Sequence, residues 1–503
     1  MSKLSKSIIQ KFSVEQKQSK VGMVVIFFDK FISIVKNYAI FLIIPMWKDF
    51  DLVLLMILIL LIALFTAALT LIEFRYFTFQ FDFNKNDFIV KKGFLKKTKL
   101  SVPLSKIQQI NLNQNFIHKF LNLYEIQMDT AGSDSKEVSI KAVTKNIADE
   151  IKEFTHILKE NNNVQSYVQK KTESKSLEID FYTLIKTGLT SRYFQTLGFI
   201  IALFFGALEY LDALGINFIP SFSSFIKNGN FGFIAILVYI ILIFLAVFTS
   251  NLISTIIKFY KFSASKTNNN LSVSYGLIST KTILMNPNKV QVFSFTQNWI
   301  QKKIDLCNII IYQASSNMNI SSDKSKEGSK VNIPGANSSD KKTIFEFIYK
   351  SFDDNELILK PNIRKFSVNF FLIGVIPSIL FFGINHFFEL LSSLNYIMIQ
   401  TIYLAVILFV SYRLYKNNIM SVSKNFIKVQ SGFWDITTKI IEIHKIQSIV
   451  IDQEIWYKKL NLANLTLCTA GGMIRFSYMD YFILRKISDN FLFKVEVSNK
   501  SWM

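Results

Sequence analysis

Four long runs of uncharged, mostly apolar residues restrict what this chain can fold into more than any other feature. They cover 52–72, 231–257, 366–388 and 390–412. A helix needs about 20 residues to cross the hydrocarbon of a bilayer, and each run reaches that length. Half of the 503 residues are hydrophobic, whereas only 18% are charged. The chain is therefore predicted to be an integral membrane protein.

Two weaker apolar segments extend this pattern to paired helices. Segment 193–211 contains the acidic residue Glu209, and segment 31–47 is interrupted by Lys36 and Asn37. Segment 31–47 is interpreted either as a span whose Lys36 extends to the interface or as a helix that lies in the interface. With this segment included, we predict six transmembrane helices in three hairpins, at 31–72, 193–257 and 366–412.

The distribution of lysine and arginine predicts the orientation of these helices. The connectors at 48–51, 212–230 and 389–393 contain only two lysines, although the formal net charge of the chain is +21. Cytoplasmic segments of membrane proteins carry an excess of Lys and Arg. We therefore expect a multi-pass protein of the cell membrane, with both termini and the domain after each hairpin in the cytoplasm.

A threefold internal repeat follows the hairpins. Each copy has a glycine between two strand-like segments, then 13 residues later a lysine that precedes an aliphatic residue and a glutamine. A further lysine follows 26 residues after the glycine, and an alanine follows 38 residues after it. The repeat-defining residues are Gly93, Gly276, Gly432, Lys106, Lys289 and Lys445. Agreement at these offsets without gaps predicts three copies of one structural unit.

Within each copy, the hydrophobic pattern predicts strands followed by one helix. Residues 77–83 alternate between apolar and polar, as in a half-buried strand. Segments 147–158 and 341–352 instead place their apolar residues on one face of a helix. The predicted fold class is α+β, with each hairpin followed by an antiparallel β domain that ends in a helix.

The ends of the repeats contain a second shared motif, Leu-Asn-Leu followed by Ala-Gly. It is present from Leu121 to Gly132 and from Leu460 to Gly471, whereas the second copy has Ser315 in place of the glycine. With the strand pair around each glycine, the Lys-Ile-Gln step and the preceding hairpins, the chain resembles bacterial PH-like membrane proteins of the YdbS/YdbT type, also called the membrane-flanked domain family. This resemblance implies a curled PH-like sheet with a C-terminal helix, and no settled activity.

These features predict a division of the chain into eight segments. The second PH-like domain is expected to contain a polar insertion at 315–330. The predicted segments are a basic cytosolic N-terminus (1–30), hairpin 1 (31–72), PH-like domain 1 (74–160), a linker (161–192), hairpin 2 (193–257), PH-like domain 2 (258–352), hairpin 3 (366–412) and PH-like domain 3 (413–503).

The sequence contains no pattern typical of a catalytic or metal site. It has no glycine-rich phosphate loop, no His-Glu-x-x-His and no Cys-x-x-Cys motif. Its four histidines and two cysteines are scattered over different segments. We therefore expect no enzymatic activity, no cofactor and no metal, and we interpret the cysteines as reduced and buried.

Five lysines within nine residues of the first repeat form the main candidate for a binding site. They are Lys91, Lys92, Lys96, Lys97 and Lys99. Near a bilayer, each basic residue contributes about 1 kcal/mol of attraction to anionic headgroups. Lysines also protect exposed sheet edges from pairing with other chains, which is the alternative interpretation.

The leading hypothesis for function is a non-enzymatic scaffold, or a protein that binds lipids or proteins at the inner leaflet. The expected partners are membrane lipids with anionic headgroups, and a related smaller PH-like membrane protein or a second copy of the chain. The alternative is a component of a membrane transport or export system. Nucleic acid is not expected as a partner, because the charge is spread along the chain without an aromatic-basic motif.

Overall fold

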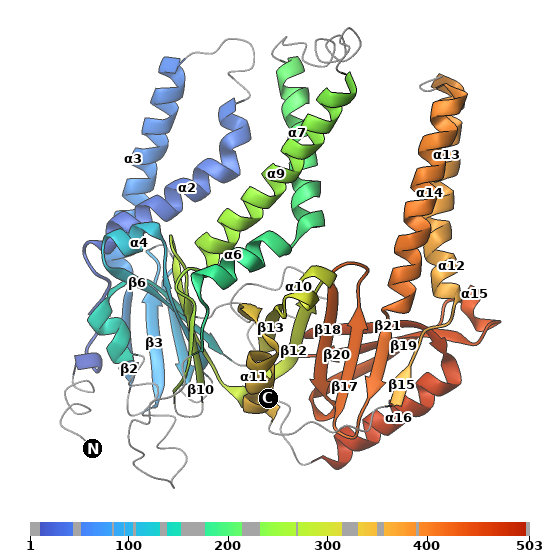
Figure 1. Cartoon of the computed structure of the whole chain (residues 1–503). Coiled ribbons are helices and arrows are strands. Elements are labelled where there is room, and N and C mark those ends of the chain that lie inside the picture. The colour runs from blue at the N-terminus through green and yellow to red at the C-terminus, as the bar shows by residue number, and fades with distance from the viewer. Residues whose placement is uncertain are drawn as a thin grey trace. The chain divides into compact units, whose positions relative to one another are not determined.

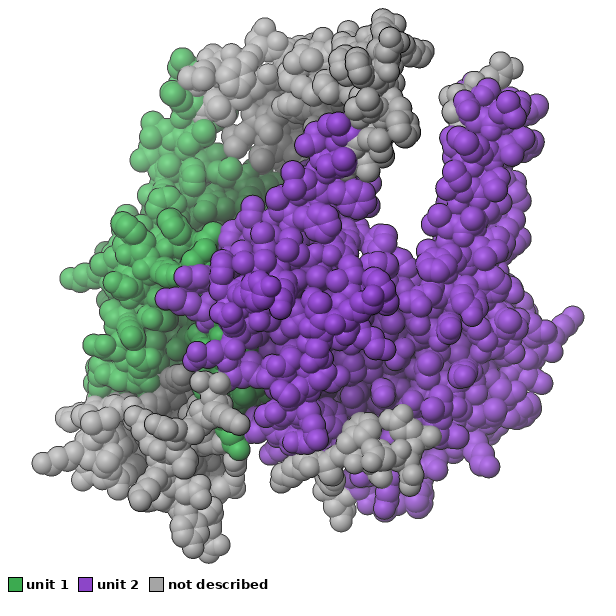
Figure 2. Space-filling model, viewed as in Figure 1, with its two compact units in different colours: residues 1–176, 262–285 green, residues 177–261, 286–503 purple. Residues whose placement is uncertain are grey.

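The computed structural model divides the protein into two compact units, residues 1–176 with 262–285 and residues 177–261 with 286–503 (Figure 2). Each unit contains apolar helices and antiparallel strands (Figure 1). The structure describes residues 11–43, 52–82, 85–94, 96–103, 107–130, 138–151, 177–213, 232–267, 270–313, 330–349, 357–388 and 392–498.

Among the described residues, four helices are long and apolar enough to cross a membrane. They are Met56–Tyr76, within α3 (Leu52–Tyr76); Ile241–Phe259, within α9 (Gly232–Phe259); Arg364–Phe388, which joins α12 (Arg364–Phe370) to α13 (Ile376–Phe388); and Ser393–Lys416, which is α14. A shorter apolar stretch, Tyr193–Gly206, lies in α7 (Tyr193–Ala213). These helices coincide with the long apolar runs of the sequence and with the weaker segment that follows residue 192.

The first predicted span differs from the observed helix. Helix α2 is Gly22–Ile43, so it begins well before the expected segment 31–47, of which residues 44–47 lie outside the described residues. Val25 is fully buried against Leu123 and Ala142, and the Ser19 amide donates a 3.0 Å hydrogen bond to the Ala142 carbonyl. The first part of α2 therefore packs on the β domain because its apolar side chains are buried there.

The basic segment from residue 11 onward is also part of the first β domain, contrary to the predicted separate segment 1–30, of which residues 1–10 lie outside the described residues. Strand β1 (Gln16–Lys17) pairs antiparallel with β2 (Thr78–Asp82). Phe12 is completely buried, and its ring meets that of Phe81 edge-on with 5.7 Å between centroids. Burial of this large aromatic side chain attaches the lysine-rich segment to the core.

The first repeat forms two short sheets around a common apolar core. The first sheet has the order β1-β2-β3-β4, with β3 at Asp87–Lys92 and β4 at Thr98–Pro103. The second begins with β5 (Ile107–Gln114), β6 (Leu123–Thr130) and β7 (Val138–Thr144), with α4 (Phe116–Phe120) between β5 and β6. A helix that begins at residue 145 follows β7, as the sequence predicts.

The strands of the second repeat are divided between the two units. In the first unit, β9 (Ser263–Thr267), β10 (Asn270–Tyr275) and β11 (Thr280–Met285) extend the sheet of the first repeat in the order β7-β6-β5-β11-β10-β9. The second unit contains β12 (Val290–Gln297), β13 (Cys307–Gln313), β14 (Lys330–Ala336) and helix α11 (Ser338–Tyr349). The predicted domain 258–352 is therefore not a separate compact body, and most of its polar insertion lies outside the described residues.

The third repeat continues the sheet of the second in the same way. In the second unit the order is β14-β13-β12-β18-β17-β16-β15, so β12 pairs with β18. The remaining strands form a sheet of order β19-β20-β21, followed by helix α16 (Tyr481–Val497). The strands are β15 (Leu357–Leu359), β16 (Ile419–Val422), β17 (Phe426–Ser431), β18 (Ile436–Glu442), β19 (Ile446–Asp452), β20 (Leu462–Thr469) and β21 (Gly472–Asp480).

The three repeat glycines occupy the same turn conformation. Gly93, Gly276 and Gly432 have φ values of +100°, +125° and +123°. A Cβ atom at any of them would lie 1.9–2.1 Å from the carbonyl oxygen three residues later. Only glycine adopts this backbone without strain, which explains its recurrence in every copy.

Two helices that precede a repeat pack against the last strand of that repeat. Helix α2 contacts β7, and α12 contacts β21. In the stretch predicted to be a linker, 161–192, the structure instead contains helix α6 (Phe181–Thr190), which contacts β14 and α9. Gly335 in β14 makes this approach possible, because a Cβ atom there would lie 2.4 Å from the Thr187 hydroxyl.

Candidate functional site

All five candidate lysines lie in one hairpin. We call residues 91–99, from the end of β3 to the start of β4, the lysine hairpin. Lys91 faces Lys99 across the hairpin, and Lys92 faces Thr98. The Lys91 ammonium donates to the Glu15 carboxylate, and this hydrogen bond lowers the pKa of Glu15. Lys91 thus has an acidic partner, while the other four lysines are exposed.

The tip of the lysine hairpin lies against the C-terminal end of an apolar helix. The ring of Phe94, next to the turn glycine, is 5.0 Å from the ring of Tyr76, the last residue of α3. Phe94 remains about half exposed. An aromatic side chain and several ammonium groups are therefore gathered where α3 ends, which is the combination that suits a bilayer interface.

The third repeat places its hairpin tip in the same way. The Asn417 side-chain amide, just after α14, donates a 2.9 Å hydrogen bond to the Gly432 carbonyl. Arg413, near the end of α14, donates to the Phe433 carbonyl at 3.4 Å. In every repeat two apolar residues follow the glycine: Phe94 and Leu95, Leu277 and Ile278, and Phe433 and Trp434. Sequence analysis missed these pairs, although apolar residues in a turn were a usable signal.

The repeat lysine of the third copy joins two repeats. Lys445 is almost fully buried, and its ammonium donates to the carbonyls of Val290 and, at 3.3 Å, Asn288. It also forms an ion pair with Glu442 at 3.1 Å. Lys289 and Lys445 both end a short 3-10 turn before a strand, whereas Lys106 lies outside the described residues. In the third copy the lysine of this motif is therefore buried and bonded within the protein, so it is not an exposed binding residue.

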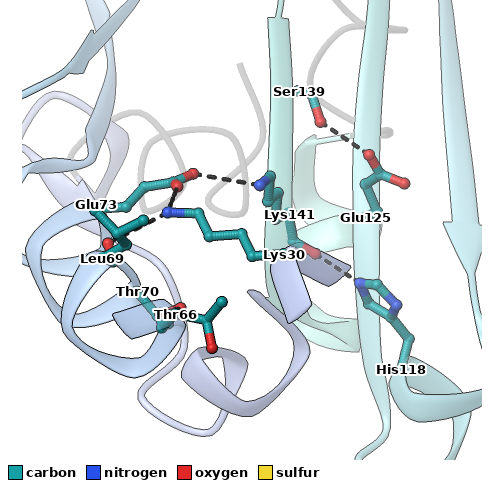
Figure 3. A network of polar contacts seen from close by, with 9 residues as sticks. All are labelled: Lys30, Thr66, Leu69, Thr70, Glu73, His118, Glu125, Ser139 and Lys141. Atoms are coloured by element: carbon teal, nitrogen blue, oxygen red, sulfur yellow. Dashed lines mark hydrogen bonds and ion pairs between the residues drawn. The ribbon is translucent and has the colours of Figure 1, made fainter. Parts of the chain in front are cut away.

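An ionic network connects the first two helices to the first β domain (Figure 3). Glu73 of α3 accepts from Lys30 of α2 at 2.6 Å and from Lys141 of β7 at 3.3 Å. Lys30 also donates to the Leu69 carbonyl, and the buried His118 ring lies 2.7 Å from the Lys141 carbonyl. This network was not predicted from the sequence, because Lys30, Glu73 and Lys141 are far apart along the chain.

The cysteines are not assembled with other reactive groups. Cys307 is buried and its thiol donates to the Ala336 carbonyl at 3.2 Å, whereas Cys468 is half-buried. Burial raises the pKa of Cys307 to about 11. Among the described residues, no three His, Cys, Asp or Glu side chains are arranged to bind a metal ion.

The raised pKa of Cys307 predicts a difference in thiol reactivity. In detergent-solubilised protein at pH 7.5, we expect a maleimide to leave Cys307 unmodified, because the thiolate fraction is very small and the sulfur is buried. Unfolding in a chaotrope should expose it to labelling. Mass spectrometry of peptides with Cys307 and Cys468 measures both sites, and rapid labelling of Cys307 in the folded protein would contradict the buried position.

Comparison with known proteins agrees with this threefold architecture. The Bacterial PH domain family matches the sequence three times, at residues 34–158, 207–351 and 370–489. A similar protein is the UPF0699 transmembrane protein YdbT of Bacillus subtilis (strain 168), which is 25% identical over 157 residues. That alignment covers 28% of this chain and 31% of the relative's length. The chain belongs to the bacterial PH domain family and carries three copies of the domain.

Proposed function

We propose that this protein is a non-enzymatic scaffold of the cell membrane, whose PH-like domains bind lipids and proteins at the inner leaflet. In this proposal six helices span the membrane in three hairpins, and the domains and both termini are cytoplasmic. The observation that carries the proposal is the continuation of the sheet of one repeat by the next, at β5–β11 and at β12–β18. Repeats that share sheets in this way suit one connected platform better than three independent modules.

The proposed topology predicts which positions are accessible from outside the cell. Asn228→Cys lies in the connector of the second hairpin and should react with a membrane-impermeant maleimide on intact cells, whereas Cys468 should not. Labelling after permeabilisation serves as the control for Cys468. Labelling of Cys468 in intact cells would contradict the cytoplasmic position of the third domain.

The lysine hairpin is the part of this platform proposed to contact lipid. Its Phe94 side chain is exposed beside the end of α3, and Lys92, Lys96 and Lys97 are exposed around the same turn. An aromatic ring can enter the headgroup layer while the ammonium groups meet anionic phosphates. Lys91 is excluded from this contact because its ammonium is bound to Glu15.

Neutralising the tip should weaken binding of anionic lipid. The change is Lys92, Lys96 and Lys97→Gln in the full-length protein, and native mass spectrometry measures added phosphatidylglycerol against phosphatidylcholine. At about 1 kcal/mol per lysine, the affinity for phosphatidylglycerol should fall by up to about 100-fold. The preference should also decrease with salt, because the Debye length shortens from about 10 Å at 0.1 M to about 3 Å at 1 M.

A matched control separates this effect from net charge. The exposed lysines Lys342, Lys424 and Lys486 are replaced by Gln in a second variant, which has the same total charge. This control should retain the lipid preference. If both variants bind lipid like the parent and the hairpin variant aggregates, edge protection is the better explanation and lipid contact is excluded.

A further inference from the structure

The repeats are joined twice by the same strand pairing, in the same register. In the first unit, Gln114 of β5 faces Thr280 of β11. In the second unit, Gln297 of β12 faces Ile436 of β18. In both cases a residue 21 positions after the glycine of one repeat faces a residue four positions after the glycine of the next. We call this arrangement a junction.

Side chains near one end of each junction add specific hydrogen bonds. The Thr280 hydroxyl donates to the Gln114 amide oxygen at 2.8 Å. In the second junction the hydroxyls of Thr296 and Thr437 are 2.9 Å apart. One residue beyond the end of β12, the Asn298 amide donates to the Asp435 carboxylate at 3.2 Å. Polar side-chain pairs therefore accompany the backbone pairing in both junctions, at neighbouring rather than identical repeat positions.

Two strands of the same kind lie at sheet edges. Strand β4 occupies the same repeat position as β11 and β18, and it lies at the edge of the sheet β1-β2-β3-β4. Strand β19 occupies the same repeat position as β5 and β12, and it lies at the edge of the sheet β19-β20-β21. The exposed fraction of the residue 18 positions after the repeat glycine distinguishes the edge strand β19 from the paired strands β5 and β12. It is 3% at Asn111 and 1% at Ser294, but 42% at Val450 in β19. In the part of the chain that the structure describes, neither edge has a further strand.

We infer that β19 of one copy of this protein pairs with β4 of a second copy and forms a third junction between chains. The register of the two observed junctions, applied to β4 and β19, places Asp452 opposite Thr98 and Gln453 opposite Lys97. The same register places Glu454 opposite Lys96, at the positions of Asn298 and Asp435. The inference deepens the proposed scaffold function, on which it rests, by naming the protein partner as a second copy.

The charges on the two edges agree with this pairing. Strand β4 and the turn before it carry Lys96, Lys97 and Lys99. Asp452 is the last residue of β19, and Glu454 follows two residues later, just before α15 (Ile455–Lys458). The Thr98 hydroxyl donates to the Lys92 carbonyl at 3.1 Å in the single chain, and in the junction it would rotate to donate to the Asp452 carboxylate instead. Lysines on an edge strand repel other basic edges, so an acidic partner strand is favoured.

A junction of this type between chains is heterologous, because β4 and β19 are different surfaces. Such contacts produce a ring when the rotation between copies closes and a linear array when it does not.

Disulfide formation between two differently tagged chains tests both the pairing and its register. One chain carries Thr98→Cys, the other carries Asp452→Cys, and both carry Cys468→Ser. Opposed Cα atoms in antiparallel strands are about 4.5–5.5 Å apart, which is within disulfide range. The control pair is Thr98→Cys with Ile451→Cys, because side chains of neighbouring residues in a strand project from opposite faces. In native membranes under mild oxidation, we expect the Thr98/Asp452 pair to yield at least ten times more mixed dimer than this control pair. Equal yields from the two pairs, or no mixed dimer, would overturn the inference.

Charge reversal provides a second, independent measurement. Asp452→Lys with Glu454→Lys should weaken self-association at least tenfold, as measured by mass photometry of the full-length protein in nanodiscs. Lys96→Glu with Lys97→Glu in the partner should restore mixed oligomers. An unchanged thermal unfolding curve shows that the variants fold, and a parent protein that stays monomeric would overturn the inference.

The β19 variants leave the lysine hairpin unchanged, so the lipid measurement remains valid for them. Loss of self-association with retained phosphatidylglycerol binding supports the junction between chains. Absence of self-association in the parent, with retained lipid binding, rejects the second copy as partner but leaves the proposed lipid contact standing. Absence of lipid binding alone rejects the lipid contact and leaves the junction standing.

Discussion

Changing Lys445 to methionine is expected to lower the free energy of unfolding by about 3–5 kcal/mol, because one partner of a buried ion pair is removed. The ammonium of Lys445 is bonded to the carbonyls of Val290 and Asn288 and to the Glu442 carboxylate. Methionine retains most of the side-chain volume, so the loss measures the polar contacts rather than a cavity. Denaturant unfolding of the second unit, followed by tryptophan fluorescence in detergent, measures the effect.

Two further variants make the Lys445 result interpretable. Lys342→Met changes an ammonium that is 77% exposed, so the free energy of unfolding should change by less than about 0.5 kcal/mol. Adding Glu442→Gln to Lys445→Met removes the unpaired carboxylate and should recover part of the loss. A Lys445→Met protein as stable as the parent would show that these contacts contribute nothing net to the joining of the second and third repeats.

Changing Gly432 to alanine should destabilise the hairpin of the third repeat by more than about 1–3 kcal/mol, the usual cost of a strained backbone conformation. Its φ of +123° disfavours any side chain, and the new Cβ would lie 2.1 Å from the Asp435 carbonyl oxygen. The backbone must shift in response. Because Asp435 bonds to Asn298 across the junction, the shift should weaken the β12–β18 contact as well.

Hydrogen exchange measured by mass spectrometry can localise this change. Faster exchange is expected in both β17–β18 and β12 of the Gly432→Ala protein. Gly198→Ala in helix α7 is the control, since no atom lies within 4 Å of the new Cβ and helix propensity gains up to about 1 kcal/mol. Exchange that changes in β17–β18 alone would show that the turn is not coupled to the junction.

Local sequence patterns predicted many of the strands and the long helices of this fold. Alternating residues mark strands such as β2, and uncharged runs mark the long helices, because both depend on which face of one element is apolar. The recurring glycines mark turns for an equally local reason, their positive φ. Periodicity did not reveal Phe12, a single apolar residue in a lysine-rich segment, or α6, a ten-residue helix in a stretch interpreted as a linker.

The pairing between repeats could not be predicted, because it depends on which edges meet in three dimensions. The polar pairs Gln114 with Thr280 and Thr296 with Thr437 look like ordinary solvent-facing residues in the sequence. The five candidate lysines share one hairpin, and their role in binding stays a prediction; the partner of Lys91, Glu15, is 76 residues distant in the sequence and could not be predicted. The burial of Lys445 likewise requires carbonyl groups that another repeat supplies.

The division of the second repeat between two sheets has a consequence for biosynthesis. Gln114 and its partner Thr280 are separated by 166 residues, and α7 and α9 are encoded between them. At about 5–20 residues per second, the ribosome needs roughly 8–30 s to produce the partner strand. During that interval one edge of β5 remains unpaired while the apolar helices α7 and α9 are being synthesised. Completion of the first unit therefore depends on timely membrane insertion, and a stalled hairpin would leave an aggregation-prone intermediate for chaperones to recognise.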